Sequence, residues 1–166
     1  MKSLTLGKLG KNLDKQSILA AIGIVISIGL VSLLADTMHN QLLLAPFGAT
    51  SIIAFLTPTA KYAMPKNIIC SYIVTAIIGL LVASLLGHSW WTYALGLGLS
   101  LIFKKMFDII HPPSAAIPII LIRAQEGTAF TLVLDSVLPG LLILVVIAII
   151  YNRYIIKTDY PIWSNQ

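Results

Sequence analysis

The stretch IIHPPSAAIPII, residues 109–120, places a histidine and three prolines inside an otherwise apolar part of the chain. Proline has no backbone N–H and breaks a helix when it lies in the interior, but it is favoured in the first turn of a helix. We therefore interpret His111 as lying near the cap of a new helix, with Pro112 and Pro113 in its first turn. A helix would then begin in the middle of apolar sequence.

The composition indicates which solvent surrounds this stretch. The chain has 166 residues, of which 58% are hydrophobic and 10% are charged, and its mean hydropathy is +0.94. A soluble domain is typically about a quarter charged, so we expect the chain to lie in a lipid bilayer. The single cysteine, Cys70, excludes an internal disulfide and a multi-cysteine metal cluster. The basic residues lie at the ends of apolar segments and form no aromatic-rich patch, so no nucleic-acid partner is expected.

Apolar segments occupy most of the chain and predict an all-α membrane protein. The second and fifth segments are short and are interrupted by proline and small residues. The N-terminal arm lacks the small-residue cleavage site of a signal peptide, so we expect it to be retained. The six segments cover residues 17–35, 42–56, 68–86, 90–103, 109–122 and 130–151.

The distribution of lysine and arginine predicts the topology. If all six segments cross the membrane, ten of the 11 basic residues fall on the cytoplasmic side and only Arg123 lies outside. If the two short segments were re-entrant, Lys61, Lys66, Lys104 and Lys105 would move to the external side. The positive-inside rule therefore favours six crossings with both termini cytoplasmic. We expect a bacterial plasma (inner) membrane protein.

The order long, short, long occurs twice. A shift of 66 residues places Pro46 on Pro112 and lays two small residues of the second segment over two small residues of the fifth. Three crossings is an odd number, so the two units must be inverted relative to each other. We predict one transmembrane transport domain over 1–166, with repeats at about 16–87 and 88–153. Inverted repeats with broken helices in matching positions point to a transport site near the bilayer midplane.

The two short segments are predicted to form an anion site. The segment APFGATS, residues 45–51, has the same features as HPPSAA. In both, proline is expected to start a helix, and small residues allow close approach of the backbone. The segments enter from opposite sides, so their N-termini would converge and present free N–H groups to an anion without a buried lysine or arginine. The predicted site residues are Pro46, Gly48, Ala49, Thr50 and Ser51, together with His111, Pro112, Pro113, Ser114 and Ala115.

Several alternatives to this interpretation stay open. Proline and small residues in membrane helices often produce only kinks and tight packing. His111 is a pore gate, a proton acceptor that sets the pH dependence of transport, or a cap. Asp135 is either a proton relay or a residue that water reaches at the outer end of its helix, and Asp108 is expected to pair with Lys104 or Lys105. A membrane-embedded enzyme using His111 with Asp135 or Asp108, and a purely structural membrane subunit, are the competing functions.

No nucleophile–base–orienter set and no metal-ligand spacing is visible, so we expect neither an enzyme nor a cofactor. His39 and His88 lie in the two external turns without carboxylate or cysteine neighbours at metal-ligand spacing. We expect the partners to be a small inorganic anion and the lipid bilayer. Transporters of this length commonly assemble, so a homo-oligomer is also expected.

Four motifs, in order along nearly the whole chain, resemble the HPP family of small integral membrane proteins. They are LLLAPFGATSIIAF, MPKNII, IIHPPSAA and YNR. The resemblance implies nitrite as a substrate, because members in cyanobacteria and chloroplasts are described as nitrite transporters. It also implies functional positions at Pro46, Phe47, Gly48, Ala49, Asn67, His111, Pro112, Pro113 and Asn152. This chain reads SAAIPI where members commonly carry an Ala-Gly-Ala-Thr run, and the family is often described with four spans.

Overall fold

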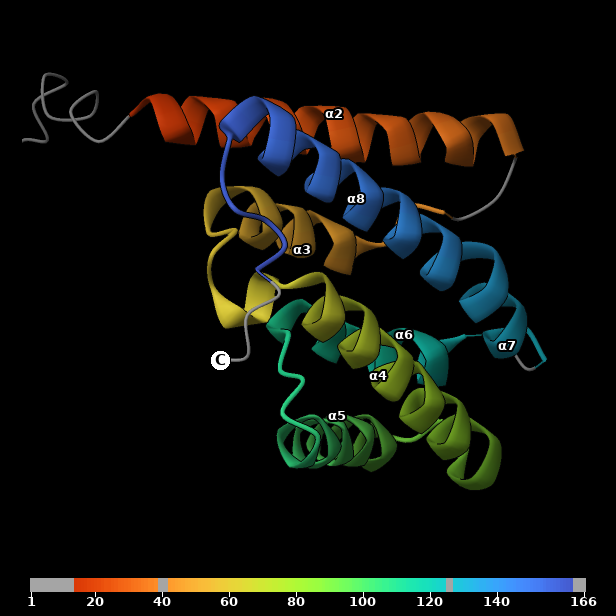
Figure 1. The fold of residues 1–166 in the computed structure, drawn as a ribbon. Helices are drawn as coiled ribbons and strands as arrows, with labels where there is room; N and C mark the ends of the chain where they lie inside the picture. Colours follow the sequence, from red (N-terminus) through yellow and green to blue (C-terminus); the bar gives the residue numbers. More distant parts are fainter. Residues whose placement is uncertain (1–13, 39–41, 125–126, 163–166) are drawn as a thin grey trace, which may run out of the picture.

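The computed structural model describes residues 14–38, 42–124 and 127–162, and this part of the chain is all-helical (Figure 1). Six helices follow one another along it, which confirms the predicted fold class. Short 3-10 or π segments begin or end several of them, and the π segment η3 joins α7 to α8 within the sixth helix. The elements are α2 (Lys15–Met38), α3 (Ala45–Leu56), η1 (Lys61–Ala63), α4 (Pro65–Leu86), α5 (Trp90–Met106), η2 (Pro112–Ala115) continued by α6 (Ala116–Arg123), and α7 (Ala129–Leu132), η3 (Val133–Val137), α8 (Leu138–Tyr151) and η4 (Asn152–Ile156).

Helix length separates the long helices from the short ones. Three helical stretches are long and apolar enough to cross a bilayer, and they are Lys15–Met38, Pro65–Leu86 and Ala129–Ile156. The 22 residues of α4, the shortest of these, give a helix of about 33 Å, which exceeds a hydrocarbon core of about 30 Å. Ala45–Leu56 and Pro112–Arg123 are shorter apolar helices, so the second and fifth helices are short as predicted.

Proline marks the start of the helices, as its missing N–H requires. Pro46, Pro65, Pro112 and Pro139 each lie in the first two positions of α3, α4, η2 and α8 respectively. The start of α5 uses a different device, a capping box in which Ser89 and Thr92 satisfy each other's backbone N–H groups. The prediction that proline begins the second and fifth helices is therefore confirmed.

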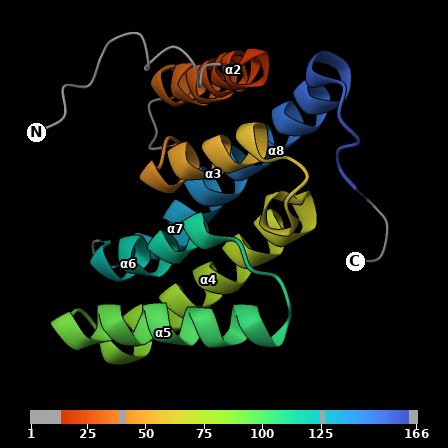
Figure 2. The same cartoon turned by 90° about the vertical axis from the view of Figure 1, so that its left-hand side faces the viewer.

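The third helix of each predicted unit packs against the other unit (Figures 1 and 2). In the upper part of both views, α2 packs on α3 and on α8, and α3 also packs on α8. In the lower part, α5 packs on α6 and on α4, and α6 also packs on α4. The two groups therefore have the same internal contacts once α2, α3 and α4 are matched with α5, α6 and α8. Two three-helix units with exchanged third helices produce this pattern.

Glycines in the third helices let these helices approach the short ones. An ideal Cβ on Gly140 of α8 would lie 2.4 Å from Phe47 Cε2 and 2.8 Å from the carbonyl oxygen of Leu42. An ideal Cβ on Gly79 of α4 would lie 2.9 Å from Pro118 Cα in α6. Contacts under 3.0 Å leave no room for a methyl group, so both helix contacts depend on glycine.

Gly23 of α2 and Gly96 of α5 have the same role in the first helices. Their ideal Cβ atoms would lie 2.6 Å from Phe55 Cδ1 and 2.9 Å from Ile122 Cδ1, both in the short helices. No neighbouring helix packs closely on Gly48 of α3, because nothing lies within 4 Å of its ideal Cβ. The close approach is made by glycines of the long helices instead.

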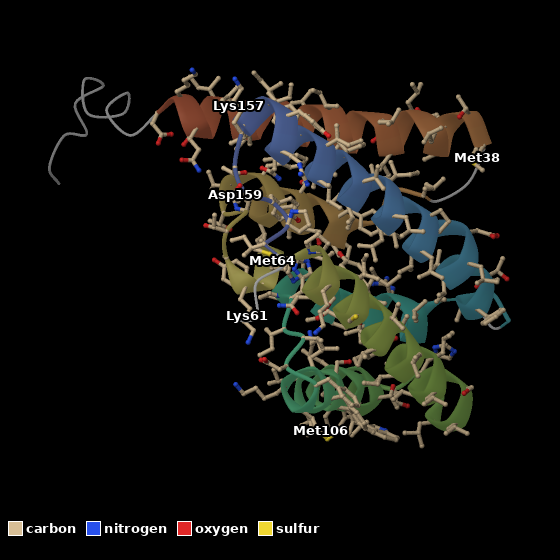
Figure 3. All side chains as sticks on the ribbon, in the orientation of Figure 1. Met38, Lys61, Met64, Met106, Lys157 and Asp159 are labelled. Carbon is tan, nitrogen blue, oxygen red and sulfur yellow. The ribbon has the colours of Figure 1, made fainter. Side chains whose placement is uncertain are left out.

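The lysine-rich end of the bundle lies opposite the C-terminal end of α2 (Figure 3). Figure 3 shows Lys61, Lys157 and Asp159 at the end of the molecule opposite Met38. In Figure 1, α2, α3, α4 and α8 run between the two sides of the molecule, whereas α5 is seen nearly end-on and crosses their direction. Asp135 is exposed in η3, near the opposite end of the bundle from Lys61, which fits the interpretation that water reaches its side chain. The predicted cytoplasmic residues Lys2, Lys8 and Lys11, and His39 of the first external turn, lie outside the described residues.

Candidate functional site

A buried hydrogen-bond network joins the two predicted units in the half of the bundle that carries Lys61. Thr50 Oγ1 of α3 lies 2.7 Å from the hydroxyl of Tyr72 in α4 and 2.9 Å from Nε2 of His111. Nδ1 of His111 lies 2.7 Å from the carbonyl oxygen of Tyr62. Thr50, Tyr72 and His111 are all 0% exposed. We refer to these three side chains as the His111 network.

The partners of His111 determine which of its nitrogens carries hydrogen. A carbonyl oxygen only accepts, so Nδ1 donates to Tyr62 and carries the hydrogen of the neutral ring. Nε2 then accepts from the Thr50 hydroxyl, which accepts in turn from Tyr72. Both ring nitrogens of His111 therefore have a hydrogen-bond partner while the ring is neutral. His111 is the residue before η2, as predicted for a cap, but its side chain makes no capping bond and instead bridges two units.

Aromatic rings enclose the network. The ring centroid of Tyr72 lies 5.8 Å from that of His111 and 5.9 Å from that of Phe47. Phe47 and Pro46 are buried in the first turn of α3. Apolar rings lower the local dielectric constant and strengthen the enclosed hydrogen bonds. Phe47, a position implied by the family resemblance, therefore contacts the network through Tyr72.

The end of α5 sets the position of His111. Asp108 has a φ of 54°, and the N–H groups of Asp108 and Ile109 donate to the carbonyls of Lys105 and Lys104 at 3.2 and 3.0 Å. This is a Schellman motif, which ends a helix and reverses the chain. Ser71 of α4 donates to the carbonyl of Ile109. The turn is thus fixed on both sides, and His111 follows it directly into the interior.

Asp108 pairs with a residue that the sequence did not indicate. Its Oδ2 lies 2.6 Å from Lys61 Nζ, and both side chains are exposed. The Lys61 hydrogen bond, with its positive charge, holds the pKa of the Asp108 carboxyl below its usual range. Asp108 is thus an ion-pair partner, as expected, but it pairs with Lys61 and not with Lys104 or Lys105, because the αL turn directs Asp108 toward η1.

Lys104 is buried, although its position in the sequence indicated a cytoplasmic surface residue. It is 3% exposed, and its Nζ lies 3.2 Å from Ser114 Oγ in η2. Ser114 Oγ donates in turn to the carbonyl oxygen of His111 at 2.8 Å. One pattern in the sequence indicates that Lys104 is buried: small or polar residues recur at every fourth position along one face of α5, and this face is the buried one. These residues are Thr92, Gly96, Ser100 and Lys104.

The predicted site residues divide into two groups. Thr50, His111 and Ser114 are brought together in the interior, whereas Ser51 Oγ only donates to the carbonyl of Gly48 in its own helix. Pro112 and Pro113 occupy the first two positions of η2 and have no N–H, so this terminus lacks two of the donors expected there. The residues that are partly or fully exposed are Gly48, Ala49, Pro112, Pro113 and Ala115.

The two short segments meet through side chains and not through their N-termini. His111, at the start of η2, contacts Thr50, which is the sixth residue of α3. Five residues of helix separate Thr50 from the start of α3, a distance of about 7.5 Å along the axis. The start of α3 packs instead against Gly140 of α8 through Phe47. The donors of this site are therefore hydroxyl, imidazole and ammonium groups.

The two asparagines implied by the resemblance hold backbone segments. Asn67 Nδ2 donates to the carbonyl of Lys61 at 2.6 Å and supports the turn that carries Tyr62. Asn152 Nδ2 donates to the carbonyls of Ala54 and Ala148 at 3.0 and 2.9 Å, which ties α8 to α3. Within the described residues, Asn152 Oδ1 is a buried acceptor with no hydrogen-bond partner.

The opposite half of the bundle contains a cavity of about 450 Å³. It opens between the C-terminal ends of α4 and α6 and the start of α7. Eight residues of α4 separate Tyr72 from Leu80 in its wall, a distance of about 12 Å along the helix. The lining residues are Leu80, Ala83, Ser84, Gly87, His88, Leu121, Ala124, Gly127, Ala129 and Phe130.

The chemistry available at the site comes from uncharged donors and one lysine. Both ring nitrogens of His111 are bonded to Thr50 and Tyr62, so neither Asp108 nor Asp135 is its hydrogen-bond partner. Throughout residues 14–38, 42–124 and 127–162, no three His, Cys, Asp or Glu side chains gather in a metal-binding group.

Comparison with known proteins identifies relatives over most of the chain. The profile of the family described as "HPP, transmembrane region" matches residues 11–161. Two proteins of Dictyostelium discoideum, each named as a transmembrane protein, are 26% and 27% identical to this chain over 129 and 127 residues. These matches cover 74% and 73% of this chain but only 45% and 41% of the two relatives. No solved structure gives a significant match.

Proposed function

We propose, from the premise that this chain belongs to the HPP transmembrane-region family, that it carries a small monovalent anion across the membrane. The chain is an integral membrane protein with several apolar helices long enough to span a bilayer. Nitrite is the candidate substrate, since the resemblance to the family's nitrite transporters extends over the APFGA and HPP segments. The site is the contact between these two segments.

One observation carries the proposal, namely the His111 network at the contact between the two units. Polar groups within a membrane-spanning bundle are costly and usually serve a substrate pathway. The network joins α3, α4 and the turn before η2, and its three members are 0% exposed. Its groups are hydroxyls and an imidazole, and no carboxylate in the described ranges bonds to them. The hydrogens of the network are all donated inside the protein, so the preference for an anion over a cation depends on the Lys104 ammonium group beside it.

The cavity at the other end of α4 and α6 supplies the outer part of the proposed pathway. An anion would pass from this cavity along α4 to the His111 network, over about 12 Å of helix. Gly79 lies on this route, and its close contact with Pro118 of α6 closes it, so passage of the anion requires α4 and α6 to separate there. We further propose a bacterial plasma membrane location, cytoplasmic termini on the side of Lys61, and a homo-oligomeric assembly.

Flux measurements with the purified protein in liposomes test the proposal. Nitrite, nitrate, formate and chloride are compared with potassium and with an uncharged solute of similar size. We expect nitrite flux well above that of empty liposomes, and small monovalent anions to be selected over potassium, because the interior supplies donors and a positive charge. Potassium flux equal to nitrite flux in the same liposomes would rule the proposal out.

A further inference from the structure

We infer that the Lys104 ammonium group, oriented by Ser114, is the binding site for the transported anion at the lysine-rich end of the bundle. This inference rests on the proposed function and names the residue that supplies the counter-charge. The pair lies next to the His111 network, because Ser114 Oγ bonds to both Lys104 Nζ and the carbonyl of His111.

Lys104 carries a charge that the protein leaves uncompensated. It is 3% exposed, and the one hydrogen bond recorded for its Nζ, to Ser114, leaves capacity for two more, since an ammonium group has three donors. Over the described ranges, the one ion pair within 4.0 Å is Lys61–Asp108, and it does not include Lys104. A buried charge without a partner costs several kcal/mol, so a bound anion would remove this cost.

The geometry favours an anion that carries a single charge. One ammonium group neutralises one negative charge, whereas a divalent anion would leave an excess charge buried beside apolar side chains. Ser114 uses its hydroxyl hydrogen on the His111 carbonyl and its oxygen on Lys104, so it fixes the ammonium without competing for the ligand. Charge-assisted bonds from the two remaining ammonium hydrogens suit the oxygens of nitrite.

Lys105 provides a matched control for the charge of Lys104. It is the adjacent residue in the same last turn of α5, but its side chain is exposed. Lys104→Gln removes the buried charge and keeps a polar side chain of similar length. Lys105→Gln removes one positive charge from the same end of the molecule without changing the interior. Lys104→Arg keeps the buried charge and shows whether substitution at this position alone disturbs the fold.

Thermal unfolding in detergent, with sodium nitrite replacing sodium gluconate at constant ionic strength, measures binding without requiring transport. A ligand that binds the folded state raises the melting temperature with its concentration. We expect nitrite to stabilise the wild type, Lys105→Gln and Lys104→Arg. In Lys104→Gln, the nitrite concentration needed for the same stabilisation should rise by about tenfold or more. Liposome flux is measured on the same four proteins.

The two measurements separate failure of this inference from failure of the proposed function. Equal nitrite stabilisation and equal flux in Lys104→Gln and the wild type would overturn the inference and leave the transport function standing. Stabilisation that depends on Lys104, without flux in the wild type, would support the binding site and reject transport. If nitrite neither stabilises the wild type nor enters liposomes that contain it, both the inference and the proposed function would be overturned.

Discussion

Replacing His111 by alanine is expected to lower the free energy of unfolding by about 3 kcal/mol. The ring is 0% exposed, so its removal leaves a cavity between the two units. The Tyr62 carbonyl would lose its bond from Nδ1, and the buried Thr50 hydroxyl would lose its acceptor and keep only its bond with Tyr72. Denaturant titration of the purified protein in detergent, followed by circular dichroism, measures the loss.

His88 provides the control for this substitution. It lies in the turn between α4 and α5, is exposed, and has one recorded hydrogen bond, from Nδ1 to the carbonyl of Ile122. His88→Ala should cost about 1 kcal/mol, the usual contribution of one hydrogen bond. Equal losses at His88 and His111 would show that the His111 network does not hold the two units together.

Replacing Gly140 by alanine is expected to destabilise the fold by about 1–3 kcal/mol through overpacking. The new methyl group would lie 2.4 Å from the Phe47 ring and 2.8 Å from the Leu42 carbonyl, which belongs to the backbone and cannot rotate away. The start of α3 would have to move away from α8. Because Phe47 packs on Tyr72, we also expect a lower nitrite flux in liposomes.

Gly29→Ala is the matched control, because Gly29 also lies within an apolar helix. Nothing lies within 4 Å of the ideal Cβ of Gly29, so the methyl group meets no neighbour. Alanine has a higher helix propensity than glycine, and Gly29→Ala should therefore leave stability unchanged or raise it by up to about 1 kcal/mol. If Gly140→Ala proved as stable as Gly29→Ala, this result would contradict the close contact between α3 and α8.

The helices could be predicted from the sequence because each depends on local features. Apolar runs determined where the long helices lie, and proline at Pro46 and Pro112 marked the starts of the short ones. Thr50, His111 and Ser114 were identified as site residues because they adjoin these prolines. The repeated order of long and short segments predicts two three-helix units, and the contacts within α2, α3 and α8 match those within α5, α6 and α4.

The remaining features depend on contacts between distant segments. Thr50 joins Tyr72 and His111 across three separate parts of the chain, and no local pattern in α4 indicates that Tyr72 takes part. Lys104 was counted as a cytoplasmic charge, because the positive-inside rule gives the side of the membrane and not the direction of a side chain. The closeness of α3 to α8 likewise depends on Gly140.

Chemical modification of a cysteine at position 114 tests most directly whether the anion passes the contact between the two units. Ser114→Cys is made in a Cys70→Ser background, which removes the single native cysteine. Nitrite uptake into liposomes is measured before and after treatment with a small sulfonate-bearing methanethiosulfonate, and modification is quantified by mass spectrometry.

The reagent would place a negative charge beside Lys104 Nζ, which lies 3.2 Å from Ser114 Oγ in the native protein. We predict that uptake is lost in step with modification, while the Cys70→Ser protein is unaffected. Undiminished nitrite uptake through fully modified protein would contradict the account.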